Sequence, residues 1–251
     1  MLQREATVVG HVRGLGRALL DDAAVWRLLA VLLAMDTVVV LCRAGRKWGV
    51  VDPLGLVPVL ADAGNWLATA KVLLIVLTMI VGWRMTGSRA YAALAIASAL
   101  ALVEVVGKFH LVVAAPLGAA LVFVEAHWRV DLFVGKAVYF GLLALALGVV
   151  VVAAWRRCTL PERGLLVVQT TAFAAVACGS VGTDLVNGAI GRLVPSAGPT
   201  LARLELAFEL VLSSVAVAVS IGVCRSVSRG RWQSAGPGVE RPGSVRSPRR
   251  H

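Results

Sequence analysis

Ionisable side chains lie inside or at the ends of several long apolar stretches of this 251-residue chain. They are Asp36, Lys71, Glu104, His110, Asp184, Glu205 and Glu209. A charge at the centre of a bilayer costs roughly 2.5–3.5 kcal/mol on insertion scales, so such residues usually serve an ion pair or a function. We therefore consider these side chains candidates for binding a ligand or a proton.

The spacing of the carboxylates indicates what this chemistry would be. Glu205 and Glu209 are four residues apart, which places them on one face of a helix. Buried carboxylates near an ammonium group can take up and release protons, and this can be coupled to the movement of a small solute. Opposite charges lower one another's desolvation cost, so we expect Lys71 to pair with Glu104 or Glu209. For three of the charged residues (Lys108, Asp184 and Glu205), a position at the hydrated end of a helix is the favoured explanation.

The apolar stretches place these residues in a membrane. The chain is 59% hydrophobic, and its mean hydropathy of +0.83 is far above that of globular proteins. A run of about 20 apolar residues is the length that a helix needs to cross a bilayer. The sequence predicts an all-α, polytopic membrane helical bundle with about six transmembrane helices, at 24–42, 66–83, 90–107, 132–155, 164–184 and 203–224.

One further apolar stretch, 111–124, is short and contains Pro116 and Gly118. We expect it to be interfacial or re-entrant; if it crosses, there are seven helices and the N-terminus changes sides. Segments rich in glycine and proline, at 43–65 and after Asp184, are predicted loops. With six spans, the candidate residues converge on the outer half of the bundle, except Asp36, which lies near the middle of the first span.

The two ends of the chain are polar. We expect residues 1–23 to form a polar cytoplasmic segment, 24–224 the bundle, and 225–251 a disordered basic tail. Seven arginines and one glutamate in the tail predict binding to anionic lipids. The net charge of +11 comes from residues that flank the spans, and no basic stripe interleaved with aromatic residues points to nucleic acid.

Basic residues near the ends of the spans predict the orientation. The side that holds the termini has eleven of them (Arg4, Arg13, Arg17, Arg84, Arg89, Arg156, Arg157, Arg163, Arg225, Arg229 and Arg231), and the other side has eight (Arg43, Arg46, Lys47, Lys108, Arg129, Lys136, Arg192 and Arg203). This excess favours both termini in the cytoplasm and a location in the cytoplasmic (inner) membrane.

No motif assigns an enzymatic activity. The four cysteines form no C-x-x-C pair, and no G-x-S-x-G motif occurs. A catalytic zinc generally needs three protein ligands, and only His110 and His127, with Glu104 or Glu125, are placed to supply them. We therefore assign no catalytic residue, metal or cofactor. Binding or transport of a small solute, with or without protons, is the favoured function. An intramembrane metal-dependent hydrolase and a non-catalytic membrane assembly subunit are the alternatives.

Three stretches within about residues 60–224 resemble a family of uncharacterised bacterial multi-pass membrane proteins. Asp62-Ala63-Gly64-Asn65 is similar to the acidic-Gly-Asn start of a span in that family, and Glu104 followed by His110 is similar to its acidic pair and histidine, with Val105 in place of the second acid. The stretch 179–184, which ends in Asp184 where Glu is usual, and the stretch 204–209 are similar to its Gly-x-x-Gly-x-acid ending and Glu-rich helix start. The resemblance implies six spans, with 111–131 in an outer connection, and it implies no particular activity.

Overall fold

A computed structural model describes residues 2–47, 56–121, 130–193 and 198–229, which form eight helices and no strand. The helices are α1 (Leu2–Leu20), α2 (Ala23–Lys47), α3 (Leu56–Thr86), α4 (Arg89–Gly107), α5 (Phe109–Leu121), α6 (Val130–Arg157), α7 (Leu160–Leu193) and α8 (Gly198–Ser228). In this part of the chain, six helices are long and apolar enough to cross a membrane: α2, α3, α4, α6, α7 and α8. The prediction of a polytopic bundle with six spans is confirmed.

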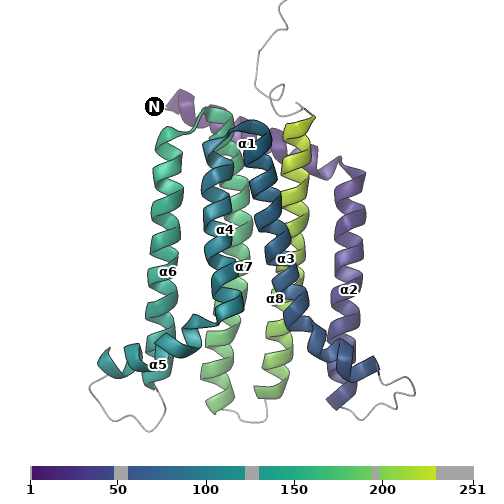
Figure 1. The fold of residues 1–251 in the computed structure, drawn as a ribbon, viewed down its shortest axis with the longest axis vertical. Helices are drawn as coiled ribbons and strands as arrows, with labels where there is room; N and C mark the ends of the chain where they lie inside the picture. Colours follow the sequence, from purple (N-terminus) through teal and green to yellow (C-terminus); the bar gives the residue numbers. More distant parts are fainter. Residues whose placement is uncertain (1, 48–55, 122–129, 194–197, 230–251) are drawn as a thin grey trace, which may run out of the picture.

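The six long helices run side by side, and α1 lies across one end of the bundle (Figure 1). We call this the α1 end; the end of α8 and the turn between α3 and α4 also lie there. The opposite end, which we call the α5 end, carries the short helix α5. Helices α3 and α8 pack together in the centre, α2 packs against both of them, and α6 packs against α4 and α7 at the other edge.

The short helix α5 has 13 residues. At 1.5 Å per residue it is about 20 Å long, less than the bilayer core of about 30 Å. It packs closely along α6: a Cβ atom added at Gly135 would lie 1.8 Å from the carbonyl oxygen of Ala114. The segment predicted to be interfacial or re-entrant is therefore a short helix whose backbone lies directly against that of α6.

Two tight turns at the α1 end are joined by hydrogen bonds. Ser88 caps α4, because its Oγ accepts a hydrogen bond from the N–H of Ala90 at 3.2 Å. The same hydroxyl donates to Glu162 Oε1 at 2.6 Å. Glu162 Oε2 accepts from the backbone N–H of Thr159 at 2.7 Å, as in a capping box at the start of α7. The connection between α3 and α4 is thereby fixed to that between α6 and α7.

A second polar contact at the α1 end involves Asp22, between α1 and α2. Its Oδ2 atom accepts hydrogen bonds from Arg225 Nε at 3.2 Å and from Arg229 Nη1 at 3.1 Å. Burial alone would raise the pKa of Asp22, but the hydrogen bonds from Arg225 and from the N–H of Ala24, together with the two positive charges, outweigh it and lower the pKa. The carboxylate therefore stays ionised and ties the start of α2 to the end of α8.

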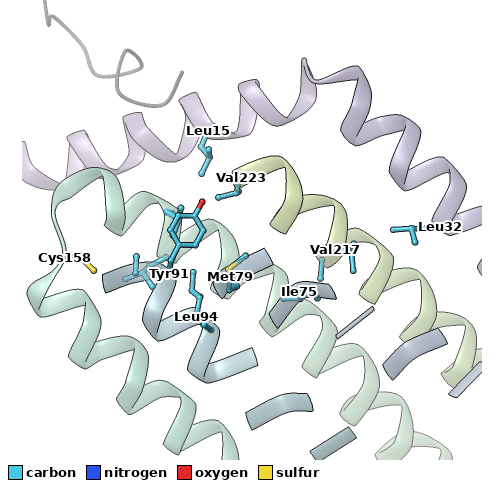
Figure 2. Close-up of a cluster of buried hydrophobic side chains, with 14 residues drawn as sticks. Leu15, Leu32, Ile75, Met79, Tyr91, Leu94, Cys158, Val217 and Val223 are labelled. Atoms are coloured by element: carbon cyan, nitrogen blue, oxygen red, sulfur yellow. The ribbon is translucent and has the colours of Figure 1, made fainter. Parts of the chain in front are cut away.

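The largest buried apolar cluster lies in the half of the bundle nearer α1 (Figure 2). The cluster combines one residue of α1 with residues of α2, α3, α4, α7 and α8; among them are Leu15, Leu32, Met79, Tyr91, Leu166 and Val223. Cys158 also belongs to it, and burial raises the pKa of its thiol to about 11. All four cysteines are free thiols.

Two predicted loops are wrong in part, because helices extend into them. Helix α3 begins at Leu56, so that Pro58 falls in its first turn, where a proline removes no helical hydrogen bond. Gly64 continues α3 and allows close approach to Val39 and Leu206.

Helix α7 continues to Leu193, past the predicted end at Asp184. The last helix also runs to Ser228, beyond the predicted start of the tail at 225, and residues 230–251 of the tail lie outside the described residues.

We expect substitution of Gly82 by alanine to destabilise the bundle by about 1–3 kcal/mol, because overpacking forces neighbours to move. A Cβ atom at Gly82 would lie 2.5 Å from the buried ring of Tyr91. Unfolding of the purified protein in detergent measures the effect. Gly148→Ala is the matched control, since its Cβ would meet nothing within 4 Å. Equal stability of the two variants would show that the packing of α3 on α4 is not as described.

Candidate functional site

Two of the predicted residues, Asp36 and Lys71, form a buried ion pair in the middle of the bundle. Each is 2% exposed, and Lys71 Nζ donates a hydrogen bond to Asp36 Oδ1. Lys71 Nζ also donates to the carbonyl oxygen of Leu210 at 2.9 Å. The second carboxylate oxygen, Asp36 Oδ2, accepts from Ser214 Oγ at 2.6 Å. The pair therefore joins α2, α3 and α8.

The predicted partner of Lys71 was wrong. Lys71 pairs with Asp36 rather than with Glu104 or Glu209, although Glu209 is near enough to act on its charge. The pair lies between two apolar clusters, with Leu32 and Ile75 on the side toward α1 and Val39 and Ala68 on the other side. Within hydrocarbon this isolation makes the hydrogen bonds strong and the loss of either partner costly.

Several of the other candidates surround a cavity of about 580 Å³ near the α5 end. Helices α3 to α8 all contribute to its walls. The lining residues are Asn65, Trp66, Ala68 and Thr69 of α3; Glu104, Val105 and Val106 of α4; Lys108 at the α4–α5 junction; His110 and Leu111 of α5; Lys136 and Phe140 of α6; Ser180 and Val181 of α7; and Glu205 and Glu209 of α8. The volume is within the range of about 300–1,000 Å³ that is typical of ligand pockets.

Glu104 forms the centre of a hydrogen-bonded group in the wall of this cavity. His110 Nδ1 lies 2.5 Å from Glu104 Oε1, and the backbone N–H of His110 donates to the same oxygen at 3.2 Å. The hydroxyl of Tyr139, on α6, donates to Glu104 Oε2. The Nδ1 atom of His110 is thus the ring nitrogen that faces this carboxylate.

The turn after α4 brings His110 back to Glu104. Lys108 has a left-handed backbone, with φ of 48°, and its N–H donates to the carbonyl oxygen of Glu104 at 2.7 Å. A residue with a Cβ adopts this conformation at a cost of about 1–2 kcal/mol. The ring of His110 then packs against Phe140 of α6 at a centroid distance of 5.3 Å. The turn therefore fixes both the imidazole and the start of α5.

Glu205 and Glu209 line the same cavity from α8. They are four residues apart, so both carboxyls lie on one face of α8. The structure thus brings Glu104, His110, Glu205 and Glu209 to one cavity and places Asp36 and Lys71 beside it. The side chain of Asp184 lies outside the described residues.

Among the residues that the structure describes, no three His, Cys, Asp or Glu side chains are placed to hold a metal ion. Two of the ligands considered from the sequence, Glu125 and His127, fall in the stretch 122–129, which is not described. Glu104 and His110 are engaged with one another and with Tyr139.

Sequence reasoning missed three residues of these sites: Tyr139, Lys136 and Ser214. Lys136 and Tyr139 lie one turn apart in the first half of a span, a spacing that could have indicated a polar stripe toward the bundle interior. Ser214 gave no comparable signal, because serine is common in membrane helices and its partner lies 178 positions away in sequence.

No family model matches this chain, and no curated protein and no solved structure matches it. The resemblance of its motifs to a bacterial membrane family stays a prediction. The site is therefore interpreted from its own geometry.

We expect Asp36→Asn to destabilise the protein by about 3–5 kcal/mol, because it leaves the buried Lys71 ammonium without a counter-charge. Lys71→Met should be similarly harmful, whereas the double variant Asp36→Leu/Lys71→Met should recover much of the loss, because apolar residues can replace a buried pair. Unfolding of all three variants in detergent gives the coupling energy. A double variant whose loss equals the sum of the single losses would refute the pairing.

Proposed function

We propose that this multi-pass membrane protein binds a small polar solute in the cavity at the α5 end and couples its binding or movement to protons. The cavity carries the proposal, because it combines a ligand-sized volume with charged and polar side chains from all six helices α3 to α8. Pockets of this kind, with a few placed polar groups in apolar walls, are the usual sites of small ligands.

The acidic residues of the cavity support the coupling to protons. Glu205 and Glu209 are one helical turn apart and repel one another when both are ionised. A proton or the positive group of a solute relieves that repulsion, so that the two compete for the same carboxylates. Ionisable residues inside membrane spans commonly serve such proton relays.

We further propose that the protein lies in the cytoplasmic (inner) membrane with both termini in the cytoplasm. The excess of basic residues at the α1 end supports this orientation, and Arg13, Arg17 and Arg84 at that end are exposed. In this orientation the cavity faces the outer side of the membrane. The basic tail would then meet the anionic lipids of the inner leaflet.

The alternative of a metal-dependent hydrolase is not favoured by any observation on the described residues. No specific observation on the described residues favours a purely structural subunit either.

The orientation is tested by reporter fusions after Gly87, Thr159 and Leu121. We expect a fluorescent cytoplasmic reporter to be active at the first two positions, which lie in turns at the α1 end. Alkaline phosphatase, which is active only outside the cytoplasm, should be active after Leu121. Cytoplasmic activity at all three positions, or the reverse pattern, would contradict the proposal.

The solute site is tested with purified protein in nanodiscs and in proteoliposomes. A panel of amino acids, amines, carboxylates, sugars and phosphate is screened for thermal stabilisation, and a pH dye inside the vesicles reports proton movement when a solute is added. We expect at least one solute to stabilise the protein, and Glu209→Gln to weaken its binding tenfold or more. Asp21→Asn, an exposed carboxylate at the α1 end, is the control. No response to any solute, or full binding by Glu209→Gln, would rule out this site.

A further inference from the structure

The charges of the cavity are separated by sign. The carboxylates of Glu205 and Glu209 come from α8, whereas the cationic and imidazole groups come from Lys108, His110 and Lys136 on or beside α5 and α6. Helices α8 and α6 each pack against α7, and the lower part of α7 lies between α8 and the α5–α6 pair (Figure 1). The cavity thus has an acidic wall on α8 and a basic wall on α5 and α6.

Glu104 does not alter this division, although it lines the cavity. Its two carboxylate oxygens accept hydrogen bonds from the ring and the backbone of His110 and from the hydroxyl of Tyr139. Its side chain is only 11% exposed. Glu104 therefore holds the basic wall in place, and the acidic wall is made by the two glutamates of α8.

The acidic and basic residues line one cavity of about 580 Å³, a size that suits a single small molecule. Neutral hydrogen-bonding residues also line this cavity: Asn65 and Thr69 of α3 and Ser180 of α7. A solute in the cavity therefore meets positive, negative and neutral polar groups.

We propose that the solute is a zwitterion of amino-acid size, whose carboxylate lies toward Lys108 and Lys136 and whose ammonium group lies toward Glu205 and Glu209. This inference rests on the solute-binding function proposed above and adds the class of the solute. A solute with a single charge would be complementary to only one of the two walls. A zwitterion matches both walls, and electrostatic complementarity of this kind determines specificity.

The experiment uses the full-length protein in nanodiscs and the twenty L-amino acids as probes in a thermal-stabilisation screen. The amino acid that stabilises most is then compared with its amide, which keeps only the positive charge, and with its N-acetyl derivative, which keeps only the negative charge. We expect both derivatives to bind at least tenfold more weakly than the parent, as measured by calorimetric titration.

Variants of each wall complete the test. Lys108→Gln should weaken binding of the parent amino acid at least tenfold and leave binding of the amide little affected. Glu209→Gln should also weaken binding of the parent amino acid at least tenfold, but it should leave binding of the N-acetyl derivative little affected. Arg84→Gln, an exposed arginine at the α1 end, is the matched control for a lost positive charge. Each variant is first shown to be folded by size-exclusion chromatography and thermal unfolding.

The outcomes separate this inference from the proposed function. If a singly charged or uncharged solute binds more tightly than every amino acid, the zwitterion proposal is wrong, whereas the proposal of a solute site is not. Equal binding of the parent and either derivative would also overturn it. The absence of any solute binding would refute both proposals together.

Discussion

Hydrocarbon offers no hydrogen-bonding partner, and this constraint determines how the chain is built. Each crossing must satisfy its own backbone groups, so six complete helices carry the chain through the membrane. The same constraint governs Asp36 and Lys71, whose polar atoms are engaged by one another, by Ser214 and by the carbonyl of Leu210. Helix α6 exposes large apolar side chains such as Leu142, Leu145 and Val149 outside its contacts with α4, α5 and α7, which is stable where lipid is the solvent.

The bundle is packed differently at its two ends. At the α1 end, a continuous apolar cluster, two hydrogen-bonded turns and the ionised Asp22 hold the helices together. At the α5 end the helices enclose a polar cavity instead. The Asp36–Lys71 pair lies between these two regions. The cavity thus lies away from the main apolar cluster, and the hydrogen bonds of Glu104 with His110 and Tyr139 hold part of its wall in place.

The sequence predicted the elements of the fold better than their contacts. The spans could be read because their length and apolar character follow directly from the thickness of a bilayer. The partner of Lys71 could not be read, because it depends on how α2, α3 and α8 are rotated and shifted relative to one another. The predicted spans that correspond to α2 and α8 hold three carboxylates between them (Asp36, Glu205 and Glu209), so the sequence alone does not determine which of them pairs with Lys71.

The loops show a similar limit. Glycine and proline suggested breaks near Pro58 and after Asp184, yet proline is tolerated in a first turn and glycine is tolerated where two helices meet closely. The grouping of Glu104 with His110 followed from their short separation in sequence. The contribution of Tyr139 depended on the packing of α6 against α4, which no local pattern encodes.

The contact between α5 and α6 has a consequence for the ancestry of this chain. Because the backbone of Ala114 occupies the space that a side chain at position 135 would need, any relative that keeps this packing must have glycine there. A Cβ atom at Gly141 or Gly148 would meet nothing within 4 Å, so a larger residue can replace either glycine without a clash. A relative with a larger residue at 135 is thus expected to hold α5 farther from α6.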